Sequence, residues 1–270
     1  MYGNGLNSKL NKQGIVSSAF LKNIAYVTMF IDHFFAIVFK TYINVYTSQG
    51  VNMDEANDIY DIGRAVGRIS FVLFAFMMAE GFKYTRNTRN YLLRLGLFAF
   101  ISEIPFDLAF YGKIFYVSKQ NIFFTLYLGV LALCLIKKFE GELFIQINCV
   151  ILCCMAAAVL KTDYMFMGVL LIVAFYICRS SFWYQFIVGS AAIYFGIIMV
   201  YVVRYWERGY ALKTYLKLGI SELYGIFAFC FIYFYNGKKG RQLPKACYYL
   251  FYPLHLLLLF YIQKTLFGQS

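Results

Sequence analysis

Two adjacent titratable residues, Asp32 and His33, lie inside the apolar stretch NIAYVTMFIDHFFAIVF. A histidine can take and return a proton near neutral pH, as a general base must. Neighbouring helix residues point about 100° apart, so the Asp32 carboxylate is not expected to orient the His33 imidazole directly. A purely structural histidine is the alternative, but ionisable side chains at membrane depth are functional by default. We therefore place both residues in a candidate catalytic site, with the chemistry on His33.

Two arginines, Arg64 and Arg68, are four residues apart in IGRAVGRIS. On a helix this spacing puts both guanidinium groups on one face. Two such forks suit phosphate, pyrophosphate or carboxylate. The alternative is that they reach the lipid headgroups, which fits Arg64 better than the deeper Arg68. The pair is the candidate site for an anionic cofactor.

The chain has two histidines, and the second, His255, also lies in an apolar segment, within FYPLHL. Pro253 removes a backbone donor just before it and is expected to kink the helix. We assign His255 to the catalytic site, where it would assist proton transfer.

Three further polar side chains are predicted to support the site: Glu80, Glu103 and Asn121. Each has a simpler explanation beside the functional one. Glu80 could form a salt bridge with Lys83 or Arg86. Asn121 could cap a helix or bond between helices.

The composition indicates the kind of scaffold that must position these residues. Of 270 residues, 61% are hydrophobic and only 14% are charged, whereas soluble domains carry about 25% charged residues. Apolar segments recur at about the length needed to cross a bilayer. We predict an all-α, polytopic integral membrane helical bundle with about 8–10 transmembrane helices. Nine spans are expected, at 20–39, 62–81, 90–110, 122–138, 142–160, 164–179, 182–203, 217–235 and 246–266.

The loop charges predict the orientation of the bundle. The loop NMDEANDIYD is acidic, whereas alternate loops are rich in lysine and arginine. Basic loops face the cytoplasm, so we expect residues 1–19 to form a cytoplasmic N-terminal segment. Residues 20–270 then form a single multi-span domain in a bacterial cytoplasmic membrane. His33 and the two arginines fall in its outer half.

The charge and the cysteines each have a simple explanation. The net charge of +12 is explained by basic loops that contact anionic lipid headgroups, and nucleic acid is not expected as a partner. The seven cysteines lie in or beside apolar runs. They lack zinc-site spacing, so neither a metal site nor a disulfide framework is predicted.

Five pieces of the chain, in order, resemble the TraX family, whose founding member is associated with acetylation of the conjugative pilin. They extend from about residue 21 to residue 256, with a departure at Val72, where the family pattern has a proline. The pieces are LKNIAYVTMFIDH, IGRAVGRISFVLFAFMMAEGFKYTRN, YLLRLGLFAFISEIPFDLAF, NIFFTLYLG and FYPLHL.

The resemblance implies a membrane acyltransferase, because the family is similar to a wider superfamily that moves acyl groups from acyl-CoA to acceptors in or beyond the membrane. It implies acetyl-CoA as the donor and His33 as the catalytic histidine, with His255 as a second. It also implies that Arg64 or Arg68 contacts the CoA phosphates. The acceptor could be a peptide or pilin N-terminal amine, or a hydroxyl on a glycan.

Two other classes of function remain open from the residues alone. A proton-coupled transporter or channel could use Asp32, His33, Arg68 and Glu103 as its path, although no internal repeat is visible. A non-enzymatic partner in envelope assembly would tolerate substitution of both histidines. The acyl chain length, the side of transfer and the oligomeric state are not indicated by the sequence.

Overall fold

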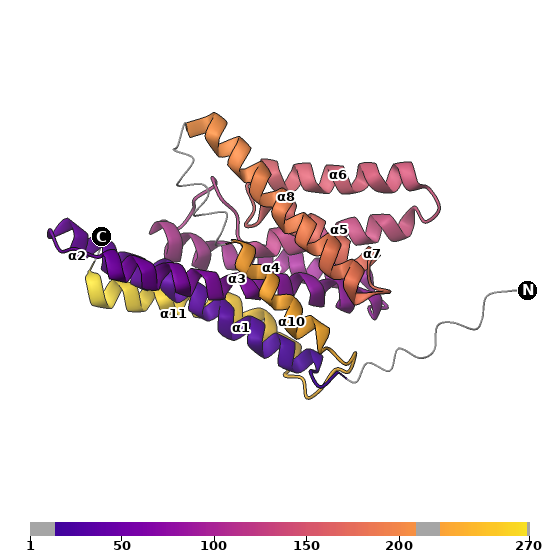
Figure 1. The fold of residues 1–270 in the computed structure, drawn as a ribbon, viewed down its shortest axis with the longest axis horizontal. Helices are drawn as coiled ribbons and strands as arrows, with labels where there is room; N and C mark the ends of the chain where they lie inside the picture. The colour runs from indigo at the N-terminus through magenta and orange to yellow at the C-terminus, as the bar shows by residue number, and fades with distance from the viewer. Residues whose placement is uncertain (1–13, 209–221, 269–270) are drawn as a thin grey trace, which may run out of the picture.

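A computed structural model describes residues 14–208 and 222–268, which form a bundle of helices (Figure 1). Most of the predicted apolar spans correspond to one helix each. The helices are α1 (Ser18–Phe34), η1 (Phe35–Phe39), α2 (Lys40–Ser48), α3 (Asp54–Lys83), α4 (Thr88–Tyr111), α5 (Ile122–Lys138), α6 (Leu143–Val159), α7 (Met165–Ile177), α8 (Phe182–Arg208), η2 (Tyr224–Phe227), α10 (Ala228–Tyr233) and α11 (Lys245–Phe267).

The first span differs most from its prediction. The chain does not leave the helix at residue 39, because α1 continues through the π-helical turn η1 into α2. Such π turns are rare, and many of those known lie at functional sites; this one begins two residues after His33. The third helix also begins earlier than predicted, at Asp54, where an acidic first turn suits the helix dipole.

Two predicted segments fall partly outside the described residues. Of the N-terminal segment 1–19, residues 1–13 are not described, and α1 begins at Ser18. Of the span 217–235, residues 217–221 are not described, and its later part is the 3₁₀ turn η2 followed by α10.

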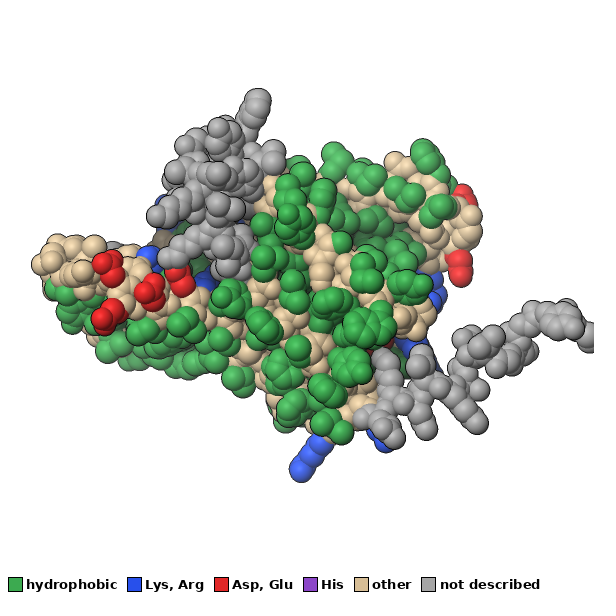
Figure 2. All heavy atoms as spheres, in the orientation of Figure 1, with side chains coloured by type: hydrophobic (Ala, Val, Ile, Leu, Met, Phe, Trp, Pro, Cys, Tyr) green, Lys and Arg blue, Asp and Glu red, His purple; other side chains and the backbone are tan. Residues whose placement is uncertain are grey.

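Four of the described helical segments are long and apolar enough to cross a membrane. Three shorter apolar helices accompany them, so the predicted number of crossings stays a prediction. Figure 2 shows hydrophobic side chains over most of the visible face, with the acidic side chains toward the two ends of the molecule. This distribution fits an all-α membrane bundle. The four long segments are Ser18–Ser48, Asp54–Lys83, Phe182–Met199 and Ala246–Phe267.

Small residues allow α1 and α3 to lie against each other. A Cβ atom added to Gly63 would lie 2.2 Å from the Phe35 ring, and one added to Gly67 would lie 2.1 Å from Oδ1 of Asp32. Glycines four residues apart let helix backbones approach closely in membranes. The sequence GRAVGR thus brings its two arginines to α1 at the level of Asp32.

Candidate active site

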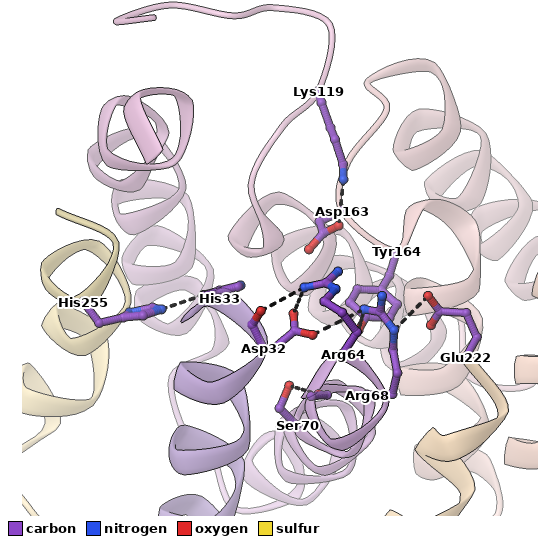
Figure 3. A network of polar contacts seen from close by, with 11 residues as sticks. Asp32, His33, Arg64, Arg68, Ser70, Lys119, Asp163, Tyr164, Glu222 and His255 are labelled. Atoms are coloured by element: carbon purple, nitrogen blue, oxygen red, sulfur yellow. Dashed lines mark hydrogen bonds and ion pairs between the residues drawn. The ribbon is translucent and has the colours of Figure 1, made fainter. Parts of the chain in front are cut away.

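The Asp32 carboxylate faces both arginines of α3 (Figure 3). Its Oδ2 is 2.7 Å from Nη1 of Arg64, which also donates to the Asp32 backbone oxygen at 3.1 Å. Its Oδ1 is 4.0 Å from Nη1 of Arg68. The predicted face of two arginines therefore exists, but a carboxylate of the chain itself already lies beside both of them.

Arg68 has further partners that come from distant parts of the chain. Its Nε lies 3.0 Å from Oε1 of Glu222, and its Nη1 donates to the Tyr164 hydroxyl at 3.2 Å. The Tyr164 ring stacks on Phe71, with centroids 3.8 Å apart. Each cation thus has an anion beside it, as charges away from water require.

The loop before α7 carries Asp163 into the same region. Asp163 lies 3.3 Å from Nζ of Lys119, and its backbone N–H donates to the Gln120 oxygen at 2.9 Å. Burial would raise the pKa of the Asp163 carboxyl, but Lys119 and Arg68 outweigh that effect and hold the pKa below its usual range. Asp163 is therefore a carboxylate at neutral pH.

The backbone of this loop is strained. Lys161, Tyr164 and Met165 have φ values of 51°, 60° and 44°, in the left-handed region that side chains other than glycine rarely adopt. The Thr125 hydroxyl donates to the Asp163 backbone oxygen and lies 2.9 Å from the Thr162 hydroxyl, which can donate to it. Strain of this kind persists where surrounding contacts impose it, and it clusters at functional sites.

His33 turns away from Asp32 and bonds to the other histidine. Its Nδ1 lies 2.6 Å from Nε2 of His255, and the ring planes differ by 8°. Nδ1 of His255 lies 2.8 Å from the Phe251 carbonyl oxygen. The expectation that Asp32 does not orient the His33 imidazole is confirmed, since His255 on α11 takes that place.

This chain of bonds fixes where the protons lie. A carbonyl oxygen only accepts, so Nδ1 of His255 must carry a hydrogen, and Nε2 of the neutral ring is then an acceptor. His33 must therefore donate from Nδ1, which leaves its own Nε2 without a proton. Among the described residues no partner bonds to this Nε2. An oriented histidine with a free lone pair is what a general base requires.

A cavity of about 290 Å³ connects this histidine with the opposite end of the bundle. Lys22, Tyr26, Met29 and His33 line it from one face of α1, and α3 lines it in the opposite direction, from Ser70 to Gly81. We call its two ends the histidine end (Asp32, His33, Ser70, Asp163, Tyr164) and the basic end (Lys22, Thr85, Tyr91, Arg94, Tyr248). Neither Arg64 nor Arg68 is among the described residues that line it.

The three predicted supporting residues lie outside this cavity lining. Asn121 caps α5 by accepting from the Phe123 N–H, and it donates to the Ala99 oxygen and to Glu103. The prediction that Asn121 caps a helix and bonds between helices is confirmed. The hydrogen bond from Asn121 also gives Glu103 a structural role, as the partner of this cap. Glu80 has no ion-pair partner among the described residues, so the predicted alternative of a salt bridge with Lys83 or Arg86 is wrong.

Sequence reasoning missed several residues of the site. Asp163 and Glu222 are acids beside apolar segments, but nothing in the neighbouring sequence identifies their partners. Tyr164 and Arg94 carried no signal beyond their residue type. Within the described part of the chain, no group of histidine, cysteine and acidic side chains is arranged to hold a metal ion.

Comparison with known proteins places the chain among proteins of one family. A family model described as TraX protein matches residues 17–263. A curated relative, the probable fimbrial assembly protein FimC, serogroup H1, of Dichelobacter nodosus, is 28% identical over 253 residues, covering 90% of this chain and 94% of the relative. No solved structure matches the chain.

Proposed function

The chain belongs to the TraX family, and from that premise we propose that it is a membrane-integral acyltransferase that moves an acetyl group from acetyl-CoA to an acceptor amine or hydroxyl. The observation that carries this proposal is the hydrogen-bonded chain from the Phe251 oxygen through His255 to His33. It leaves Nε2 of His33 free to accept a proton, on a residue that lines a cavity large enough for a thin substrate.

The reaction that this arrangement supports begins with proton transfer. Nε2 of His33 takes a proton from the acceptor nitrogen or oxygen, which attacks the thioester carbonyl carbon. The carbon–sulfur bond then breaks, and the departing thiolate takes the proton back from Nε2, so that free CoA leaves as a thiol. Positive charge on the His33 ring is shared with His255 through the Nδ1–H···Nε2 bond, which is how a second group assists a base.

Asp32 has a positioning role in this proposal. It joins α1 to α3 through Arg64 and Arg68 and so holds the helix segment that carries His33. The arginines are already matched by carboxylates, and their role toward the CoA phosphates stays a prediction. Glu80, Glu103 and Asn121 support the fold around the site and lie outside the cavity lining.

The acceptor is inferred from chemistry and from the relative. The D. nodosus relative is named a probable fimbrial assembly protein, and this favours a peptide or pilin amine in the envelope over a glycan hydroxyl. With the basic loops in the cytoplasm of a bacterial cell, the basic end of the cavity lies on the cytoplasmic side, where the donor is. The histidine end then lies nearer the outer surface, where such an acceptor would arrive.

The relative's name also supports a second candidate, a non-enzymatic partner in fimbrial assembly. Such a protein needs its folded surface, but it does not need His33 to accept a proton. It predicts that the assembly phenotype survives replacement of either histidine.

A label-transfer experiment tests the acyltransferase proposal. Inverted membrane vesicles that contain the chain are given acetyl-CoA labelled in the acetyl group, and label in the protein and glycan fractions is measured. We expect label with the wild-type chain, and its loss with His33→Gln. Arg89→Gln, an exposed change on α4, serves as the control that keeps transfer. Equal transfer by His33→Gln would remove His33 from the chemistry.

A further inference from the structure

Arg94, at the basic end of the cavity, is a cation without an anionic partner among the described residues. It lines the cavity from α4. Its Nε is buried and has no hydrogen-bond partner in the part of the chain that the structure describes. Among the described residues, Arg94 forms no ion pair. The residue as a whole is half-buried, and a partly desolvated cation without an anion beside it is available to an anionic ligand that enters the cavity.

A second cation and several aromatic rings lie at the same end. Lys22 donates from Nζ to Oε1 of Gln242 at 2.5 Å and lies 4.5 Å above the Tyr248 ring. The rings of Tyr26 and Tyr248 are 5.7 Å apart and within 14° of parallel. Cations beside flat aromatic faces suit a ligand that combines phosphate with a heteroaromatic base.

The length of the cavity connects this end with the chemistry. Lys22 and His33 are eleven residues apart on one helix, which corresponds to about 16 Å. Between them the lining is apolar or aromatic: Tyr26 and Met29 from α1, and Phe74 and Met77 from α3. A ligand held by its anionic end at Arg94 would therefore reach His33 with a long, thin and largely apolar arm.

The arginines at the other end are less suited to hold phosphate. Arg64 and Arg68 already contact Asp32 and Glu222, and neither guanidinium lines the cavity. An added phosphate would have to displace a carboxylate that is covalently part of the chain. It would also lie beside His33, where the thioester rather than the phosphate must be.

We infer that Arg94, with Lys22, binds the phosphorylated nucleotide end of the thioester donor, and that the pantetheine arm lies along α1 and α3 with its thioester at His33. This inference rests on the proposed function, because it needs a donor of the coenzyme A type. It moves the phosphate site from the arginine pair of α3 to the opposite end of the cavity.

Binding measurements on the purified full-length protein test the inference. CoA and phosphate-free pantetheine are titrated into the wild-type chain, Arg94→Gln, Arg94→Lys and Arg89→Gln, which alters an exposed arginine of the same helix. We expect the wild type to bind CoA more tightly than pantetheine. Arg94→Gln should weaken CoA binding at least tenfold without changing pantetheine binding, and Arg94→Lys should recover part of the loss. Arg89→Gln should match the wild type.

Two results would overturn the inference, and they differ. If the wild type binds CoA and Arg94→Gln binds it equally well, the phosphate site is elsewhere and the acyltransferase proposal stands. If the wild type binds neither CoA nor pantetheine, the donor itself is wrong, and the inference falls together with the proposed function. The midpoint of thermal unfolding without ligand shows that each variant is folded.

Discussion

The two ends of one cavity use positive charge differently. Behind the histidine end, and outside the cavity lining, Arg64 and Arg68 contact Asp32, Glu222 and the Tyr164 hydroxyl. The buried Nε atoms of Arg68 and of Arg94, at the basic end, both lack a hydrogen bond, but among the described residues only Arg68 lies beside carboxylates. Cations matched within the fold hold helices together, whereas a cation left without an anion is available to a ligand. In the proposed function, the α3 arginines hold the helix segment that carries His33, whereas Arg94 would bind the donor.

The largest expected difference between the two ends is in turnover. His33→Gln keeps an amide that can donate to His255 but has no base, so acetyl transfer should fall by about 10²- to 10⁴-fold. CoA binding should stay at the wild-type level, because the change lies at the far end of the cavity. Steady-state transfer and CoA titration on the same preparation check both halves. If His33→Gln also lost CoA binding, catalysis and donor binding would not be separated between the two ends of the cavity.

The second difference is in stability. Arg68→Gln leaves Glu222 without its cation, and breaking one partner of a buried pair costs about 3–5 kcal/mol. The side chains of Arg68 and Glu222 are 13% and 29% exposed, so the effect should lie toward the lower value. Thermal unfolding in detergent measures it, with Arg94→Gln as the matched removal of an arginine.

The double variant Arg68→Gln/Glu222→Gln sharpens this result. Removing both charges should restore much of the unfolding midpoint that Arg68→Gln loses. If Arg68→Gln and Arg94→Gln unfold alike, the contrast between a matched and an unmatched arginine is wrong.

A smaller effect is expected where α1 and α3 approach each other. Gly67→Ala adds a methyl group that would lie 2.1 Å from Oδ1 of Asp32, and such overpacking costs about 1–3 kcal/mol. The helices must separate, so acetyl transfer should fall with the unfolding midpoint. Gly96→Ala is the control, because its nearest neighbour would be 3.6 Å away on the Tyr127 ring. Equal behaviour of the two variants would show that the close approach is not needed.

The smallest effect is expected at Lys22. This side chain already donates to Gln242 and lies over Tyr248, and a partly solvated ion pair contributes about 0.2–1 kcal/mol. Lys22→Gln should weaken CoA binding by no more than about fivefold, and the difference should shrink as salt is added. Titrations at low and high salt measure it, with exposed Lys83→Gln as control. A loss larger than that of Arg94→Gln would reverse the order of the two cations.

The sequence predicts what is local in this fold. The span 122–138 matches α5 in both bounds, since Asn121 marks its start and a lysine pair its end. The divergence of Asp32 and His33 follows from helix geometry alone. The face shared by Arg64 and Arg68 follows from their spacing.

What the sequence does not predict depends on contacts between distant segments. His33 and His255 are 222 residues apart in the chain, and Arg68 and Tyr164 are 96 apart. Periodicity within one helix carries no information about which neighbouring helix it faces. The continuation of α1 through η1 was missed because apolar content falls after residue 39 while the backbone stays helical. The sequence does not distinguish Arg94 from other basic residues near loops, because its position in the cavity lining depends on tertiary contacts.

The most direct test of the central claim, acyl transfer through His33, is a search for the missing acetyl group in cells. Envelope proteins and glycans from a deletion strain carrying no copy, the wild-type chain or His33→Gln are compared by mass spectrometry. We expect one or more acetylated species that are missing in the deletion strain, that the wild-type chain restores and that His33→Gln does not restore. Full restoration by His33→Gln, at matched levels of protein in the membrane, would contradict it.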